Sequence, residues 1–412
     1  MTRWQRGVIS LNLGLGLSYI ALWIIAGAQD LFWRADFTAF YTGGALVRDG
    51  YGRQLYDRAL QTQYQQQILE GRSFKEGLLP YNYPPHAVLP FVLLASMPLI
   101  SAFRIWTLVQ IALLVWLMHL LYQFAQTWQP PERWLLLTTA LALPSLARTF
   151  LVGAFSLWSL ICLLQFYISL KKAGETQAGL WFALGTVKPQ NLLLPGVLIL
   201  SARRWRTLAS LLWIGAGMIA FCSAWLGWEN WTSFLYTLRE TSRYYGVLGV
   251  NPRGMYNLKG ALTLLLGNEQ GLMINQISLA ALLLAALVAF LIWRGPWRPN
   301  APDFELRMAL TLLLGLLFSP HLNPQDGLLL VAPAALFYAY LRQRQLPRRA
   351  YAVFVLSCPL LFLIAEAALG GKLGIRIPTL AMVVLAIWMG AAFYSEQRVA
   401  LQSRPVQPAN GA

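Results

Sequence analysis

The chain consists largely of apolar runs separated by short polar linkers. Most runs approach the about 20 residues that a helix needs to cross the hydrocarbon core of a bilayer. This pattern predicts an all-α polytopic membrane protein with about twelve transmembrane helices. The runs lie at residues 8–28, 86–100, 103–125, 133–151, 154–170, 178–201, 206–227, 274–294, 307–319, 327–342, 350–370 and 377–395.

Two longer polar segments, residues 29–85 and 228–273, are expected on the outer face of the membrane. In the first, apolar side chains share one helical face with Gln and Arg opposite, which predicts an amphipathic helix along the membrane surface. That face consists of Leu55, Tyr56, Ala59, Leu60, Tyr64 and Ile68. We expect one membrane domain over residues 1–412, with a flexible cytoplasmic tail over residues 396–412.

Composition excludes a soluble protein. The chain is 57% hydrophobic and 12% charged, with a mean hydropathy of +0.52, whereas soluble domains contain about 45–50% apolar and about 25% charged residues. Much of the net charge of +16 lies in short linkers, where the positive-inside bias explains it. Nucleic acid is therefore not an expected partner. The three cysteines lie in apolar runs without metal-ligand spacing, which indicates packing residues.

One pair of lysines leaves the topology open. An even number of spans keeps both termini in the cytoplasm and places most arginine-rich linkers there, but it places Lys171 and Lys172 outside. If that pair lies inside, residues 178–201 form a re-entrant hairpin that turns at Lys188 and Pro189 instead of a span, and the order of crossings over residues 86–154 must change.

Asp36 is the first candidate for chemistry. It follows the first apolar run and lies among aromatic and small residues. A carboxylate that is partly removed from water at a membrane surface is suited to act as a general base. The alternative is a structural role, in which Asp36 caps a helix that starts at Phe37. One aspartate can serve both roles.

Residues 319–326, Ser-Pro-His-Leu-Asn-Pro-Gln-Asp, lie between two short apolar runs. Polar and turn-forming residues here predict broken helices around a water-filled cavity, because unpaired backbone is not tolerated against lipid. His321 would then lie on the same side as Asp36. An ordinary loop is the alternative, although it does not explain the short flanking runs.

Other polar residues are ambiguous by themselves. Tyr83 and His86 lie where the outer segment re-enters the membrane, where an aromatic belt and a proline-started helix are also expected. Lys188 lies within an apolar stretch with no acid nearby in sequence, so a bound phosphate is an attractive partner. Arg148 raises the same question more weakly, and Arg253 lies among basic and aromatic residues of a segment that also reads as a solvated loop.

These residues resemble glycosyltransferase family 87, whose members have the GT-C fold and use polyprenyl-phosphate sugars, mostly mannose. The resemblance extends over about residues 8–345 and depends on the order of its elements. These are Asp36, Phe40-Tyr41, Gly50, Leu55-Tyr56-Asp57, Tyr83-Pro84-Pro85, Pro98, Trp106, Gly179, Lys188-Pro189 and Ser319-Pro320-His321. Where the family usually shows Gly-Gln, this chain has Gly153-Ala154, so one polar contact is missing.

The resemblance implies an inverting transferase on the periplasmic or extracellular face, with Asp36 as the base. A hexose would move from a polyprenyl-phosphate donor to a lipid or glycan acceptor. No cofactor or metal is expected, since no acidic pair stands near Asp36 and a lipid monophosphate donor does not need one. The candidate substrate-binding residues are Tyr41, Tyr83, His86, Lys188, Gln190, Arg253, His321, Asn323 and Gln325.

Two other classes compete with this interpretation. A transporter or flippase of lipid-linked or small sugars often shows internal repeats and intramembrane carboxylates, but no repeat is evident here. A ligase of envelope polymers would be expected to show a larger outer loop late in the chain.

Overall fold

The computed structural model describes residues 2–29, 31–72, 74, 77–241, 251–346, 358–369 and 376–402. Within these residues the protein is helical, apart from one isolated β-bridge between Phe74 and Gly77. The all-α prediction is therefore confirmed. The helices are α1 (Arg3–Ala28), α2 (Phe37–Arg48), α3 (Arg58–Ile68), α4 (Leu89–Leu94), α5 (Leu99–Phe124), α6 (Pro130–Ala142), α7 (Pro144–Val152), α8 (Ser156–Lys171), α9 (Glu175–Leu184), α10 (Leu193–Ser201), α11 (Trp205–Leu226), α12 (Glu229–Thr241), α13 (Leu258–Leu266), α14 (Gly271–Trp293), α15 (Phe304–Leu317), α16 (Val331–Gln343), α18 (Cys358–Leu369) and α19 (Ile377–Gln402).

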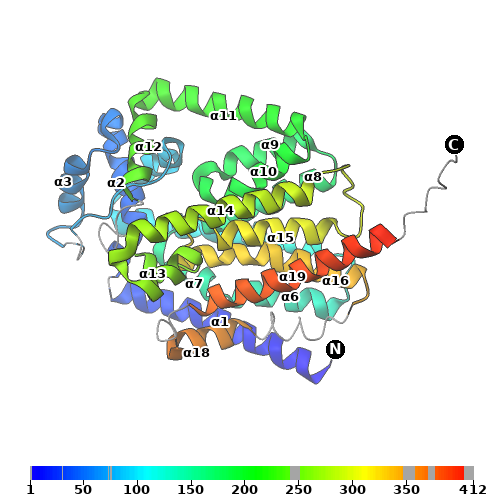
Figure 1. Ribbon diagram of the computed structural model, residues 1–412. Coiled ribbons are helices and arrows are strands. Elements are labelled where there is room, and N and C mark those ends of the chain that lie inside the picture. The colour runs from blue at the N-terminus through cyan, green and yellow to red at the C-terminus, as the bar shows by residue number, and fades with distance from the viewer. Residues whose placement is uncertain are drawn as a thin grey trace, which may run out of the picture.

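Several long helices run in nearly the same direction, with α11 along one edge and α1 along the opposite edge (Figure 1). In the described part of the chain, five helices are long and apolar enough to cross a membrane: α1, α5, α11, α14 with the turn before it, and α19. A sixth span results if α6 and α7, which meet at a bend of 44°, are counted as one. As far as the structure describes them, the remaining apolar runs form shorter helices, and the expected count of about twelve spans remains a prediction.

Two of the expected spans are not single helices. Residues 86–100 form a 3₁₀ turn (η3, Pro85–Val88) and the short helix α4. Together these are roughly 15 Å long, which is too short for a hydrocarbon core of about 30 Å. Instead, α4 packs against α2. At Gly44 of α2, a Cβ atom would lie only 2.3 Å from the carbonyl oxygen of Phe91, so glycine is needed for this close approach.

Residues 178–201 form a helical hairpin, which is the shape that the second of the two topologies predicts. Helices α9 and α10 are joined by the turns η4 (Gly185–Val187) and η5 (Pro189–Leu192), with Lys188 between them. Glu175 at the start of α9 forms an ion pair with Arg204 just after α10. The start of α9 and the end of α10 therefore lie at the same end of the molecule. Lys188 lies at the tip of the hairpin, away from that end. Lys171 and Lys172 consequently lie with Arg204.

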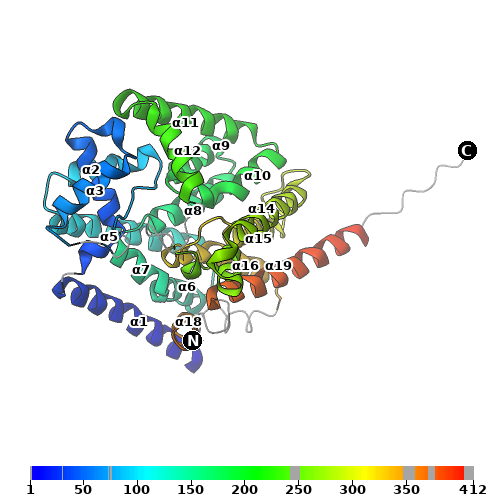
Figure 2. The same ribbon diagram turned by 60° about the vertical axis from the view of Figure 1, so that its left-hand side comes forward.

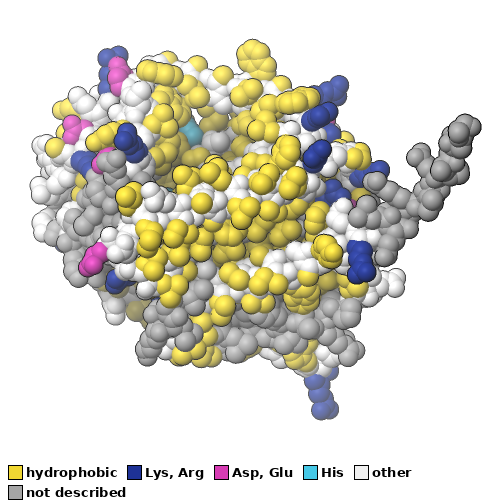
Figure 3. Space-filling model, viewed as in Figure 1, with side chains coloured by type: hydrophobic (Ala, Val, Ile, Leu, Met, Phe, Trp, Pro, Cys, Tyr) yellow, Lys and Arg dark blue, Asp and Glu magenta, His cyan; other side chains and the backbone are white. Residues whose placement is uncertain are grey.

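Ion pairs gather at that end of the molecule. Lys and Arg side chains are prominent there, while apolar side chains cover the middle of the visible face (Figure 3). The pairs are Lys171–Glu305, Arg204–Glu175, Arg307–Asp303, Arg342–Glu132 and Arg344–Glu396. Helices α2 and α3 lie far from the last residues of α19 in both ribbon views (Figure 2). The last helix, α19, extends to Gln402, so part of the expected tail is helical, and residues 403–412 lie outside the described residues. Of the expected span 350–370, residues 350–357 and 370 also lie outside them.

The outer amphipathic helix is present as α3, with Asp57 accepting a capping hydrogen bond from the Leu60 amide at 3.0 Å. Its buried face differs from the predicted one. Gln61 and Gln65 are only 1% and 2% exposed. Gln65 exchanges two hydrogen bonds with the backbone of Leu79, and Gln61 accepts one from the amide of Tyr81. The helix is thus docked on residues 78–81 by its glutamines, because a buried amide side chain can satisfy backbone groups that a leucine cannot.

Candidate active site

Asp36 lies between a 3₁₀ turn (η1, Phe32–Arg34) and α2, which starts at Phe37 as the sequence suggests. Its carboxylate makes no capping hydrogen bond to α2. Instead, Oδ2 of Asp36 accepts a hydrogen bond of 2.9 Å from Nε2 of Gln325. The capping alternative is therefore wrong for this carboxylate, which is directed away from its own helix and toward residues 319–326.

Residues 319–326 separate two helices, as predicted. Helix α15 ends at Leu317, and the next element is a 3₁₀ helix (η8, Pro324–Leu330) that leads into α16. Distant segments bind the backbone between them. The Asn257 side chain donates to the carbonyl of Ser319 at 2.6 Å, and the Tyr256 amide donates to the carbonyl of Leu322 at 2.9 Å. These bonds satisfy polar backbone that would otherwise be costly within an apolar protein.

A cavity of about 290 Å³ opens beside Asp36. Six of the ten candidate site residues line it: Asp36, Tyr83, Gln190, His321, Asn323 and Gln325. The further lining residues are Ala39, Leu79, Pro80, Asn82, Pro84, Arg148, Val187, Pro189, Phe234, Leu238, Asn251, Gly254, Met255 and Pro324. The six candidate residues come from four segments that are far apart in sequence, and the fold brings them together.

Three other candidates lie away from the cavity lining. The Tyr41 hydroxyl donates to the carbonyl of Met97 at 2.6 Å within an aromatic core. Nε2 of His86 lies 3.4 Å from the Thr186 hydroxyl, and its ring lies 6.3 Å from that of Trp231. Arg253 is exposed. Its sequence neighbours Arg243, Tyr244 and Tyr245, which suggested a basic and aromatic surface, lie outside the described residues.

Lys188 is the fourth candidate that does not line the cavity. It is 2% exposed and forms an ion pair with Asp326. Asp326 also accepts a hydrogen bond of 2.7 Å from the Ser156 hydroxyl. The anionic partner inferred for Lys188 is therefore supplied by the protein. Sequence reasoning missed it because the two residues are 138 positions apart, although Asp326 closes the motif that was singled out for other reasons.

Electrostatics at the cavity favour a basic carboxylate. Burial raises the pKa of Asp36 above its ordinary value, and the nearby charge of Asp326 raises it further, while Lys188 and Arg148 lower it. Arg148, from α7, is the one Lys or Arg among the described residues that line the cavity. The positive charge of Arg148 opposes protonation of Asp36 and can also bind an anion.

His321 is a neutral group in this environment. Burial lowers its pKa to about 4, and the positive charge of Lys259 lowers it as well, against a small opposing effect of Asp326. At pH 7 its imidazole is therefore uncharged and offers one donor and one acceptor. It can bind a hydroxyl group but adds no positive charge to the cavity.

Other lining groups are available to a ligand. Within the described residues, the Tyr83 hydroxyl and the side-chain amides of Asn82, Gln190, Asn251 and Asn323 make no hydrogen bond to protein. Hydroxyl and amide groups can donate and accept, which suits a polyhydroxylated ligand. No group of three or more His, Cys, Asp or Glu side chains that could hold a metal occurs among the residues that the structure describes.

Ala154 is buried and is not among the residues that line the cavity. The side-chain amide of Gln110 donates to its carbonyl at 3.0 Å, and the Trp106 indole donates to the carbonyl of Gly153 at 2.8 Å. Two side chains of α5 thus hold the backbone at the position where a polar side chain was expected.

The structure thus combines a helical membrane protein with one cavity lined by a carboxylate and several amides, which suits a polar ligand. The sequence model of glycosyltransferase family 87 matches residues 81–320. This is more than half of the chain, which therefore belongs to glycosyltransferase family 87 and is a membrane glycosyltransferase. The matched residues include Tyr83, Lys188 and Gln190 but begin after Asp36 and end just before His321. No curated protein and no solved structure matches the chain.

Proposed function

We propose that the protein transfers a hexose, specifically mannose, from a polyprenyl-phosphate donor to a hydroxyl group of a lipid or glycan acceptor. The observation that carries this proposal is the Asp36 carboxylate, held in the cavity by Gln325 in a chain that belongs to family 87. The apolar surface of the helical bundle accounts for a donor whose polyprenyl tail remains in the membrane.

Asp36 acts as the general base. It accepts the proton of the acceptor hydroxyl while that oxygen forms a bond to the anomeric carbon of the sugar. The bond between the anomeric carbon and the phosphate oxygen breaks, and its electron pair leaves with the polyprenyl phosphate. Attack from the face opposite the leaving group inverts the configuration. A raised pKa makes Asp36 a stronger base than an ordinary surface aspartate.

Arg148 binds the phosphate of the donor. A leaving phosphate needs fixed positive charge in a site from which water is excluded. Lys188 is committed to Asp326, whereas Arg148 lines the cavity that contains Asp36. Lys188 then acts at a distance, since its charge still lowers the pKa of Asp36.

The site faces the periplasm or the cell exterior. The basic ion pairs gather at the end of the molecule where α1 begins, and Asp36 follows the other end of α1. Cytoplasmic linkers carry the excess of lysine and arginine in membrane proteins. This asymmetry supports an inward basic end and an outward cavity.

The alternative is a transporter or flippase of a sugar substrate. Ion-coupled transporters use carboxylates in the membrane that bind and release an ion or proton. Here Glu305 is paired with Lys171, Glu366 with Arg376 and Asp326 with Lys188. Asp36 is the acidic residue that lines the cavity, which favours chemistry over ion coupling.

The test is a transfer assay in lipid nanodiscs, with labelled polyprenyl-phosphate-mannose and a panel of envelope lipids. Asp36→Asn is expected to abolish transfer while the protein remains folded and inserted. Asp57→Asn is the matched control, because asparagine also caps helices and Asp57 lies outside the cavity. Near-normal turnover by Asp36→Asn would remove Asp36 as the base.

A further inference from the structure

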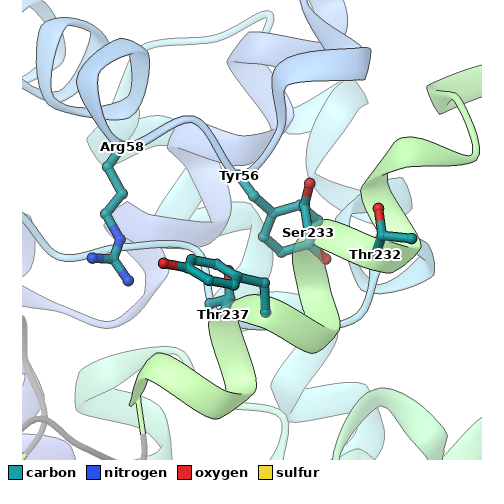
Figure 4. Close-up of a pocket in the computed structure, with 6 residues that line it drawn as sticks. Tyr56, Arg58, Thr232, Ser233 and Thr237 are labelled. Carbon is teal, nitrogen blue, oxygen red and sulfur yellow. The ribbon is translucent and has the colours of Figure 1, made fainter.

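A second pocket, of about 440 Å³, lies between the outer segment and α12. Figure 4 shows its lining side chains approaching from two elements, Tyr56 and Arg58 from the outer segment and Thr232, Ser233 and Thr237 from α12. Tyr236 completes the lining. The start of α12 is fixed to the outer segment, because the Asn230 side chain donates to the carbonyl of Gly52 at 2.8 Å.

This pocket shares a wall with the cavity that contains Asp36. Phe234 and Leu238 of α12 line the first cavity, while neighbouring residues of the same helix line the second pocket. The Tyr56 hydroxyl donates to the carbonyl of Tyr83 at 2.5 Å, and Tyr83 lines the first cavity. Tyr56 also packs near Phe234, with ring centroids 6.1 Å apart. Two ligand groups, one bound in each pocket, would therefore be separated by α12 and by the pair of Tyr56 and Tyr83.

The chemistry of the second pocket suits sugar hydroxyls. Five of its six side chains carry a hydroxyl and the sixth carries a guanidinium, with no acid among them. In the described part of the chain, the hydroxyls of Ser233, Tyr236 and Thr237 have no hydrogen-bond partner. Hydroxyls can donate and accept, the guanidinium donates in a plane, and tyrosine rings provide flat apolar surfaces beside polar tips.

We propose that this pocket is an acceptor subsite that binds sugar units already present on the acceptor, while the hydroxyl to be glycosylated reaches Asp36. The assignment depends on the proposed transferase function and specifies its acceptor as a glycan of at least two sugar units, free or lipid-linked. The donor occupies the cavity of Asp36 and Arg148.

Kinetics with acceptors of graded length test the subsite. The probes are octyl glycosides with one, two or three mannose units, and the donor is polyprenyl-phosphate-mannose. For Ser233→Ala and for Arg58→Gln, we expect KM for the longer acceptors to rise about fivefold to tenfold, as for the loss of one hydrogen bond. KM for the one-sugar acceptor and for the donor should remain unchanged. Ser96→Ala, an exposed serine outside both cavities, is the matched control.

Equal changes for all three acceptors, or no change for any of them, would overturn the subsite. Binding of octyl trimannoside to Asp36→Asn protein without donor separates this result from failure of the proposed function. If no transfer occurs with wild-type protein but the trimannoside binds and Ser233→Ala or Arg58→Gln weakens its binding, the pocket stands and the transfer reaction is wrong. If wild-type protein transfers mannose but the trimannoside binds no better than the one-sugar glycoside, the pocket proposal fails and the transferase stands.

Discussion

Gln325 holds the carboxylate of Asp36 with a 2.9 Å hydrogen bond, although the two residues are 289 positions apart. The backbone of Gln325 is fixed separately, because its carbonyl accepts a hydrogen bond of 3.3 Å from the Thr149 hydroxyl. The side chain of Gln325 can therefore be changed while the turn that carries it keeps this anchor.

Gln325→Ala is expected to lower kcat by about tenfold to a hundredfold, since a hydrogen bond to a charged group contributes about 1.5–3 kcal/mol. Gln325→Glu places a second carboxylate beside Asp36, which raises the pKa of Asp36 and moves the acid limb of the pH–rate profile to higher pH. Measurement of kcat between pH 5 and 8 checks both expectations. Normal kcat in Gln325→Ala would show that this contact does not position the base.

Arg148→Gln should impair the enzyme in two separable ways. Donor KM rises because the phosphate loses its cation, and the acid limb of kcat/KM moves to higher pH because the charge of Arg148 lowers the pKa of Asp36. Activity requires deprotonated Asp36, so a higher pKa removes activity at the low-pH side. Arg148→Lys should retain the position of the limb. Arg104→Gln, an exposed arginine of α5, serves as the control, and an unchanged donor KM in Arg148→Gln would contradict the phosphate role.

Lys188→Met should destabilise the protein by about 3–5 kcal/mol, because it leaves the buried carboxylate of Asp326 without its cation. The double variant Lys188→Met/Asp326→Asn removes both charges and keeps an acceptor for the Ser156 hydroxyl. We expect it to recover most of the lost stability in denaturant unfolding in detergent. Donor KM close to the wild-type value in the double variant supports a structural Lys188, whereas a large increase would return Lys188 to the phosphate site.

Gln65→Ala should loosen the wall of the cavity. It leaves the amide and carbonyl of Leu79 without their partners, at about 1–3 kcal/mol for an unsatisfied buried group, and Leu79 lines the cavity. Hydrogen exchange over residues 78–84 should accelerate and substrate KM should rise. Gln67→Ala, an exposed glutamine of the same helix, should change neither. Unchanged exchange in Gln65→Ala would argue against the docking of α3 through its glutamines.

The sequence indicated the helical membrane class, the start of α2 at Phe37, and a polar break at residues 319–326. These features follow from local periodicity, breaker residues and composition, which a single chain displays directly. Contacts between segments that are distant in sequence could not be predicted from these local patterns. The partner of Lys188 lies 138 positions away, and the buried side of α3 depends on glutamines that pattern reasoning assigns to solvent.

The length of an apolar run also gave a wrong helix length where the run continued through a turn. Residues 178–201 are apolar throughout most of their length, so hydropathy alone does not separate one crossing from two short antiparallel helices. The ion pair between Glu175 and Arg204 distinguishes them, and it requires the fold to be known.

A segment that enters and leaves through the same end does not change the orientation of the chain that follows it. Removal of the α9–α10 hairpin would therefore leave α11 and the later helices facing the same way, while the lysine that neutralises Asp326 would be lost. We expect a chain with a defective hairpin to insert in the normal orientation but to be less stable, because the buried carboxylate of Asp326 lacks its cation.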